Sequence, residues 1–325
     1  MIGYPRDCEL FNDVIDNKVE KGGLKHLGSG GYGDVLLYTS KKNDVVIKRV
    51  KSGQGCKNMK EFKIHELLSK DGNKHLIQLF DVLKTQNFLF FYLEYAAAGD
   101  LEQSIKSKGM LPSTIAKEYF IQMIDGVQFM HSLGVVHRDL KPADLFLTSD
   151  GILKIGDFGF ATKFRDDDGG NMLVTLCGTA KYWAPEVETL KKLVDGPPLD
   201  AWTCGIILIE MLTGRRPWEV ATLKNMENWI SQVEGKNLPW NNVEADVMSL
   251  LRKILVVDPV KRATIDNIHE DKWLNGNKNI ENVNGGETAK PRKDRQRKVQ
   301  DVVTIAEENG RKRQRVPKKK FSCLD

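Results

Sequence analysis

The segment 137–144, which reads His-Arg-Asp-Leu-Lys-Pro-Ala-Asp, holds two carboxylates, an imidazole and two cations within eight residues. Apolar residues flank it, so we expect a loop between two buried elements. Pro142 is expected to exclude a helix there and to bias Lys141 toward an extended backbone. A further carboxylate, Asp157, follows downstream, and the Phe-Gly after it suits a sharp turn. This spacing predicts a site for phosphate and a divalent cation; a solvated loop with ordinary ion pairs is the alternative.

A glycine-rich turn is expected near the N-terminus. It consists of Leu27, Gly28, Ser29, Gly30, Gly31, Tyr32, Gly33, Asp34 and Val35. The chain continues as Leu-Leu-Tyr, which is β-prone, so the pattern favours a hairpin over the strand-to-helix turn of a dinucleotide fold. Glycines let backbone N–H groups approach a phosphate without obstruction by Cβ. Many such hairpins bind nothing, so this segment alone does not establish a site.

The first 95 residues predict a small, mostly antiparallel sheet with one helix. The helix is expected over 58–70, with Glu61 one turn inside it. One strand ends in a cation, Lys48, which on its own would be read as a solvated edge lysine. Strands are expected at 19–25, 45–48, 76–80 and 87–95.

Beyond a linker at 96–100 the pattern becomes mainly helical, interrupted by a β-hairpin at 145–155. The chain turns helical again from Leu199, and Gly214 is expected to end a buried helix over 202–212. The other helices are expected at 100–108, 112–133, 222–233, 243–256 and 264–271.

The bulk composition is that of an ordinary globular chain of 325 residues, with 41% hydrophobic and 29% charged residues. The longest apolar run, 88–93, is far shorter than the roughly 20 residues that span a bilayer, and residues 1–10 lack an apolar core, so neither a membrane span nor a signal peptide is expected. Five scattered cysteines without a C-x-x-C pair favour a reducing compartment over a disulfide framework or metal cluster.

Five motifs occur in a characteristic order. They are G-x-G-x-x-G-x-V at 28–35, V-x-I-K at 45–48, H-R-D-L-K-P at 137–142, D-F-G at 157–159 and A-P-E at 184–186. Together they resemble the protein kinase signature set. Two further likenesses support this: Asp200-x-Trp202-x-x-Gly205 is similar to the kinase helix that braces the catalytic loop, and Arg262 to the arginine that pairs with the A-P-E glutamate, here Glu186.

The resemblance covers about residues 20–274 and implies an α+β, two-lobed protein kinase fold. A small antiparallel N-lobe with one main helix would occupy 19–95, and a larger, mainly helical C-lobe 96–274. Residues 1–18 would form a leader, and 275–325 a basic, disordered tail.

The resemblance also implies ATP and Mg²⁺ as cofactors. The turn at 27–35 would cover the nucleotide phosphates. Lys48, oriented by Glu61, would hold the α- and β-phosphates. Glu94 and Ala96 would offer backbone groups to the adenine base. A plain surface Lys–Glu pair is the alternative for Lys48 and Glu61.

Four residues would carry the transfer itself. Asp139 would accept or orient the proton of the substrate hydroxyl, and Lys141 would steady the γ-phosphate. Asp157 and Asp144 would ligate Mg²⁺, which prefers carboxylate oxygen.

Lys141, Gly178-Thr179 and Tyr182 resemble serine/threonine kinases, with Ser and Thr side chains of proteins as acceptors. Within that group the chain is similar to the DNA-damage checkpoint effector kinases. The stretches that carry this likeness are 93–95, 99–101, 161–165, 177–179, 201–206 and 253–256. A cell-cycle or DNA-damage checkpoint role would follow.

Several positions depart from the kinase pattern. Asp144 replaces a usual asparagine and adds a negative charge beside the phosphates. Val46 and Phe146 add bulk to the walls of the adenine slot. Ala143 and Asp100 replace glutamates that help related kinases recognise arginine in the substrate. A catalytically impaired pseudokinase scaffold is therefore the alternative function.

Regulation is expected at the segment after Asp157. Arg138 suggests a pocket for a phosphate on Thr162, Thr175 or Thr179. The run Asp166–Asp168 already supplies negative charge, so we hypothesise that this segment orders without phosphorylation.

The charge of the chain is uneven. Residues from 275 onward hold 14 Lys and Arg against 7 Asp and Glu, so the rest of the chain sums to −2 of the total of +5. Basic clusters at 290–298 and 311–320 resemble a two-part import signal, which implies an import receptor as partner and the nucleus, with the cytoplasm, as location. A solvating tail or non-specific nucleic-acid binding is the alternative.

Overall fold

The computed structural model describes residues 24–30, 33–39, 44–51, 55–166, 168–188, 193–219, 221–222, 224–226, 228 and 243–276. The expected leader at 1–18, the strand start before Leu24, Gly31 and Tyr32 of the glycine-rich turn, and the tail beyond Gly276 lie outside these residues, and so does most of the helix expected over 222–233. The chain divides into two units, Met1–Gly276 and Asn277–Asp325, and every described residue belongs to the first.

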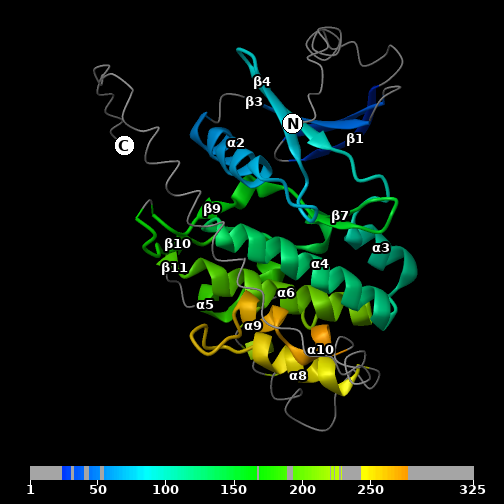
Figure 1. The fold of residues 1–325 in the computed structure, drawn as a ribbon, viewed down its shortest axis with the longest axis vertical. Coiled ribbons are helices and arrows are strands. Elements are labelled where there is room, and N and C mark those ends of the chain that lie inside the picture. The colour runs from blue at the N-terminus through cyan, green and yellow to red at the C-terminus, as the bar shows by residue number, and fades with distance from the viewer. Residues whose placement is uncertain are drawn as a thin grey trace, which may run out of the picture. The chain divides into compact units, whose positions relative to one another are not determined.

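Five antiparallel strands form the predicted N-terminal sheet, in the order β1-β2-β3-β5-β4 (Figure 1). They are β1 (Leu24–Gly30), β2 (Gly33–Tyr38), β3 (Val45–Lys51), β4 (Leu79–Lys84) and β5 (Phe88–Glu94). Successive residues of β5 alternate between two hydrophobic clusters, because strand side chains point to opposite faces. Phe90 packs with Ile47, and Phe91 packs with Val50 in the cluster that Phe62 of helix α2 (Gly55–Lys70) covers.

Strands β1 and β3 extend beyond their expected ends, to Gly30 and Lys51, and the start of β4 differs from the sequence-based prediction. β4 was expected at 76–80 but begins at Leu79. The backbone N–H of Ile77 donates instead to Ile155 O at 2.8 Å, and Leu76 forms an isolated bridge with Ile155. This stretch is therefore an anchor between the sheet and the second lobe, which a β-prone pattern cannot distinguish from a strand.

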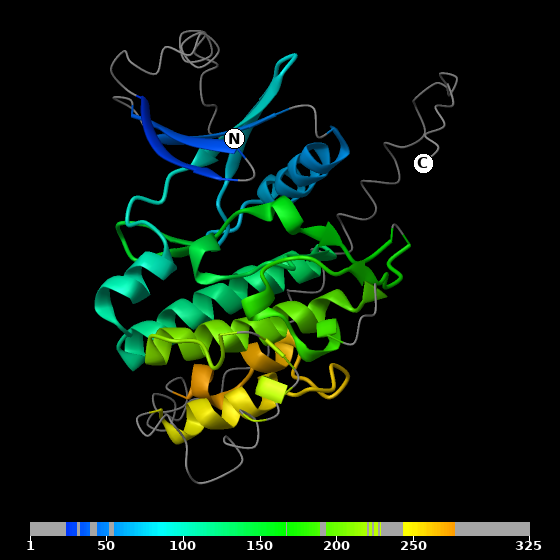
Figure 2. The same cartoon turned by 180° about the vertical axis from the view of Figure 1, so that it is seen from behind.

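The second lobe is mainly helical, as predicted. Its helices are α3 (Leu101–Lys108), α4 (Ser113–Ser132), α5 (Pro185–Glu188), α6 (Gly196–Thr213), α8 (Ala245–Ile254), α9 (Ile265–His269) and α10 (Lys272–Asn275). Its short strand pairs are β6 (Val135–Val136) with β9 (Thr162–Lys163), β7 (Leu145–Leu147) with β8 (Leu153–Ile155), and β10 (Val174–Thr175) with β11 (Leu193–Val194). Helices α4 and α6 lie side by side in Figures 1 and 2, with fully buried Phe120 and Trp202 in the same core.

Local chemistry explains the helix boundaries. α6 begins at Gly196, before the expected Leu199, because prolines are tolerated in a first turn; it ends at Gly214 (φ 73°), as predicted. The single helix expected over 264–271 is instead α9, which Thr264 caps, followed by α10, which Asp271 caps. Among the described residues, no helix combines the length and apolarity needed to cross a membrane.

A buried ion pair ties the loop between α8 and α9 to helix α5. Arg262 donates from Nη1 and Nη2 to the two carboxylate oxygens of Glu186, both at 2.7 Å, and from Nη1 to Pro198 O at 2.7 Å. Its guanidinium carbon also lies 5.0 Å from the centroid of the Trp202 ring. The Glu186–Arg262 pair expected from the sequence is thus confirmed.

We predict that Glu186→Gln lowers the free energy of unfolding by about 3 kcal/mol, because it leaves a buried guanidinium without a counter-ion. Urea denaturation measures this as a lower midpoint. Asp246→Asn is the matched control, since it breaks an exposed pair with Lys272 and should leave the midpoint unchanged. An equal midpoint for both variants would contradict the role given to the buried pair.

Candidate active site

Asp200 of helix α6 fixes the charged loop that follows β6. Its carboxylate is 1% exposed and accepts hydrogen bonds from the backbone N–H groups of His137 and Arg138, both at 2.9 Å, while His131 Nε2 lies 2.9 Å away. Burial alone would raise the pKa of Asp200, but the hydrogen bond and charge of His131 outweigh it and lower the pKa. The ionised Asp200 carboxylate therefore fixes the backbone of the loop at His137 and Arg138.

Two residues of the charged segments have a strained backbone. Arg138 has φ 68° and Asp157 has φ 55°, a region that non-glycine residues occupy at a cost of about 1–3 kcal/mol. They are the only two such residues in the described part of the chain. Both belong to the motifs singled out from the sequence, so strain coincides with the predicted site.

Asp139 is held from two sides. Its Oδ1 accepts the backbone N–H of Thr179 at 2.6 Å, and its Oδ2 accepts Lys141 Nζ at 2.5 Å. Lys141 Nζ also lies 3.1 Å from Asp144 Oδ2. Burial alone would lower the pKa of Lys141, but the Asp144 and Asp139 carboxylates raise it to about 12. Lys141 therefore stays cationic between two acids.

Lys48 forms the centre of a second charged group. Its Nζ lies 2.8 Å from Glu61 Oε1 on α2 and 2.8 Å from Asp157 Oδ1. Both carboxylates raise the pKa of Lys48 against the effect of its burial, and Lys48 keeps the pKa of Asp157 low. Phe158, fully buried, packs edge-on against the rings of His65 and His137 at 4.6 and 5.7 Å between centroids.

Asp144 supplies the carboxylate oxygen best suited to a cation. It is 4% exposed, and its Oδ2 has the ion-pair contact with Lys141 at 3.1 Å but no hydrogen-bond partner among the residues described. Burial raises the pKa of Asp144 well above its usual range, and the charges of Asp157 and Asp139 add to the rise. A divalent cation would relieve this cost.

The residues present fit Mg²⁺. The described part of the chain has no group of three or more metal-ligating side chains, but Asp144 and Asp157 line one cavity. Mg²⁺ is commonly bound by one or two carboxylates, with phosphate oxygens and waters completing the shell.

The segment that carries Asp144 corrects one expectation. Lys141 is extended (φ −160°, ψ 162°), as predicted, but a short 3₁₀ turn spans Pro142–Asp144 although Pro142 was expected to exclude helix. Proline is tolerated at a first helical position because the N–H it lacks has no partner there.

The cavity between the lobes has a volume of about 540 Å³, within the range of small-molecule sites. Val46 and Phe146 both line it, so their bulk does not close the slot. From the glycine-rich turn, Leu27, Gly28, Gly33 and Val35 reach its wall; Ser29, Gly30 and Asp34 do not.

The cross-strand contacts of the turn explain this division. Asp34 accepts Ser29 Oγ at 2.8 Å and Arg49 Nη2 at 2.6 Å, so these side chains hold β1, β2 and β3 together. Gly33 (φ 127°) lies against Arg49 O, where a Cβ would come within 1.9 Å. Only glycine fits that position.

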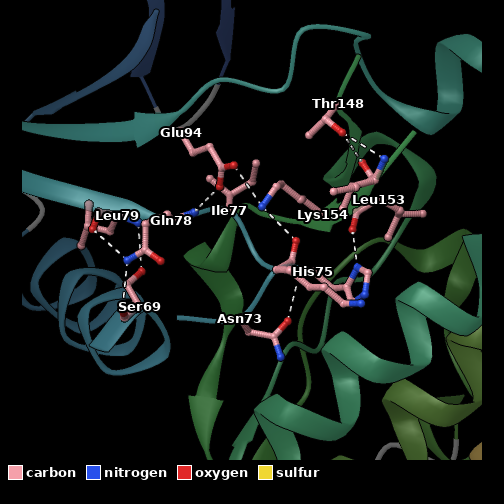
Figure 3. Close-up of polar contacts among 12 residues, drawn as sticks. Ser69, Asn73, His75, Ile77, Gln78, Leu79, Glu94, Thr148, Leu153 and Lys154 are labelled. Carbon is pink, nitrogen blue, oxygen red and sulfur yellow. Dashed lines mark hydrogen bonds and ion pairs between the residues drawn. The ribbon is translucent and has the colours of Figure 1, made fainter. Parts of the chain in front are cut away.

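Glu94, the last residue of β5, lines the cavity and forms polar contacts with neighbouring elements. The Glu94 carboxylate accepts Lys154 Nζ at 3.0 Å and the Gln78 N–H at 3.1 Å (Figure 3). Ala96 lines the cavity, and its N–H donates to no residue in the described part of the chain. That Glu94 and Ala96 offer backbone groups to an adenine base stays a prediction.

Sequence analysis missed Lys154. It is 8% exposed and also donates to Lys74 O at 2.9 Å (Figure 3). It connects β5, the 73–78 stretch and the β7–β8 hairpin. In the sequence, its place between the apolar residues Leu153 and Ile155 was the signal that could have found it. The structure buries all three residues of this short strand.

Arg138 binds the segment after Asp157 directly. It donates from Nε to Phe160 O at 2.8 Å and from Nη1 to Thr175 O and Oγ1 at 2.7 and 2.9 Å. Asp166, expected to supply charge to this region, instead caps its own turn through the N–H groups of Asp168 and Gly170. Thr162 is buried in β9.

The model of the protein kinase domain matches residues 23–274. The chain belongs to the protein kinase family. The two-lobed α+β fold and the resemblance inferred from the five motifs are thereby confirmed.

Curated kinases are similar over the same region. Serine/threonine-protein kinase chk-1 of Caenorhabditis briggsae is 37% identical over 78% of this chain and 53% of its own length. The chk-1 kinase of Caenorhabditis elegans is 36% identical over 81% of this chain and 54% of its own, and the Drosophila melanogaster serine/threonine-protein kinase grp 36% over 77% and 49%. The kinase chain thus spans about half the length of these relatives.

We predict that Asp144→Asn raises the Mg²⁺ concentration needed for nucleotide binding by about tenfold, the effect of one charge-assisted contact, because the kinase keeps a ligand oxygen but loses a charge. Binding of ADP at saturating Mg²⁺ should tighten, since repulsion of the phosphates falls. ADP-induced thermal shifts across a Mg²⁺ titration measure both effects. Asp166→Asn, outside the cavity, serves as control, and an unchanged Mg²⁺ dependence for Asp144→Asn would contradict its role as a ligand.

Proposed function

We propose that this chain is a serine/threonine protein kinase that transfers the γ-phosphate of ATP to serine or threonine of protein substrates, with Mg²⁺. One observation carries the proposal. Lys48 contacts Glu61 and Asp157 at once, on the wall of the cavity that Asp144 also lines. Nucleotide phosphates therefore have a preassembled cation and two carboxylates that can share a metal.

Different residues of the site would bind the phosphates, the acceptor hydroxyl and the metal during phosphoryl transfer. Lys48 would bind the α- and β-phosphates, and Lys141 the γ-phosphate. Asp139, whose Oδ1 is fixed by Thr179 N–H, would orient the acceptor hydroxyl and take its proton. Mg²⁺, when held by Asp157 and Asp144, supplies neutralisation of the phosphate charge.

The acceptor class and biological role rest on the relatives. Those reported above are named serine/threonine-protein kinases, two of them chk-1. With the resemblance seen in the sequence, they support a role in DNA-damage or cell-cycle checkpoint signalling. Nothing favours the alternative of a pseudokinase scaffold, because Lys48, Glu61, Asp139, Lys141 and Asp157 are all present and in contact as pairs.

We predict that Asp139→Asn lowers kcat by at least about a hundredfold, the usual contribution of acid–base catalysis, while MgATP binding stays intact. Transfer of labelled γ-phosphate to a serine peptide, beside a MgATP-induced thermal shift, separates the two effects. A wild-type chain with no MgATP shift, and no transfer that depends on Asp139, would instead support the scaffold.

For the basic tail, we propose recognition by a nuclear import receptor through the clusters at 290–298 and 311–320. The spacing of Lys and Arg supports it. Deletion of residues 277–325 should shift a tagged protein from nucleus to cytoplasm. An unchanged nuclear distribution would refute the proposal, and salt-sensitive DNA binding by the tail would favour the nucleic-acid alternative.

A further inference from the structure

The activation segment is the stretch 157–186, from the D-F-G to the A-P-E motif. A buried ion pair beside its end has no part in the mechanism above. Glu210, near the end of α6, is 6% exposed. Its Oε2 accepts the Tyr182 hydroxyl at 2.8 Å, and its Oε1 accepts Arg216 Nη1 at 3.0 Å. The Arg216 guanidinium also lies 5.8 Å from the centre of the Tyr182 ring. Both carboxylate oxygens of Glu210 are therefore occupied from within the chain.

This ion pair is connected to the catalytic centre by a short run of backbone. The N–H of Thr179 binds Asp139, and Tyr182 ends the single 3₁₀ turn that follows, with its N–H 3.0 Å from Thr179 O. Tyr182 and Thr179 also line one small cavity together with Asp139. An acceptor segment whose hydroxyl reaches Asp139 would approach Tyr182, whose own hydroxyl binds Glu210.

The loop that follows α6 holds Arg216 in place. Gly214 (φ 73°) packs so closely on Gly109 that a Cβ would lie 1.6 Å from its carbonyl oxygen. Two residues beyond Arg216, Trp218 stacks on Trp202 with centroids 6.1 Å apart and donates from Nε1 to Lys181 O at 3.3 Å. The arginine is thus presented by a fixed turn.

Other acids near the acceptor path are also engaged or absent. Asp100 caps α3 through the N–H of Gln103 at 2.8 Å and binds its Nε2 at 2.9 Å. Glu102 pairs with Lys106 at 2.8 Å. Position 143 is alanine. Glu219, 90% exposed and 3.9 Å from Arg216, is solvated and contributes little.

Glu210 needs a cationic partner. Burial raises its pKa, Tyr182 and Arg216 oppose the rise, and the charge of Glu102 adds to it. Without Arg216 the carboxylate would be left partly buried beside the acceptor path with only a phenol as donor. A basic side chain of a bound peptide would then be its natural counter-ion.

We propose that Arg216 is a specificity-determining residue. It pairs with Glu210 within the kinase, so the acceptor peptide needs no arginine or lysine at the position that would face Glu210. The inference rests on the proposed kinase function. The expected acceptors are serine or threonine segments that carry no basic residue at the position facing Glu210.

Peptides with one serine in an uncharged sequence, and one arginine moved through the positions on either side, test the proposal on the full chain. For the wild type, kcat/KM should stay within about twofold of the arginine-free peptide at every position. In Arg216→Ala and Arg216→Gln, one position should become preferred by about tenfold, the effect of one charge-assisted hydrogen bond. Adding Glu210→Gln to either variant should abolish that preference.

Arg215→Ala is the matched control, because the Arg215 side chain is exposed and forms no ion pair with any described residue; it should leave all ratios at the wild-type value. Thermal melting confirms that each variant is folded, and Arg216→Gln keeps much of the stem and a donor if alanine is not tolerated. A wild type that already prefers arginine tenfold, or folded Arg216 variants with unchanged ratios, would overturn the inference. A wild type that phosphorylates no peptide or protein would overturn the proposed function instead.

Discussion

The carboxylate of Asp200 is the contact on which the rest of the site depends. It lies on α6, a deeply buried helix of the second lobe. It accepts hydrogen bonds from two consecutive backbone N–H groups of the catalytic loop, residues 137–144. Two hydrogen bonds from a rigid helix fix both position and direction of the loop, and they hold Arg138 at its positive φ. The side chains of Asp139 and Lys141 follow from that backbone.

From this loop, charge connects the two lobes. Arg138 joins the catalytic loop to the activation segment through Phe160 and Thr175. Asp157 joins that segment to Lys48 of the sheet, and Lys48 joins the sheet to Glu61 of α2. Each link is short, and all but the exposed Arg138–Thr175 contact are partly or fully buried, where electrostatic attraction is stronger than in water. The site is therefore assembled by contacts of this chain alone.

The parts that the sequence predicted are those whose chemistry dictates residue type and spacing. A signature of separated motifs identifies Lys48, Glu61 and Asp157, and the structure brings these three side chains into contact. The pairing of Glu186 with Arg262 was found the same way. Periodicity also located most helices and strands, because burial on one face leaves a pattern.

The remainder depends on tertiary partners that no local pattern reveals. Stretch 76–78 looks like a strand, and only the position of Ile155 makes it an anchor. In the sequence, Lys154 and Arg216 look like surface cations. In the structure, Lys154 pairs with Glu94, far away in the chain, and Arg216 pairs with Glu210 across a turn. Asp166 was expected to supply negative charge to the segment after Asp157, and its carboxylate instead closes its own turn.

The most direct measurement of a preassembled site is single-turnover transfer by protein that carries no phosphate. Protein from a host without the upstream kinase would be treated with phosphatase, and mass spectrometry would verify that Thr162, Thr175 and Thr179 are unmodified. We expect transfer of the ATP γ-phosphate to a serine peptide at a rate close to that of untreated protein. Loss of transfer that returns only when one of these threonines is phosphorylated would contradict assembly by the chain's own contacts.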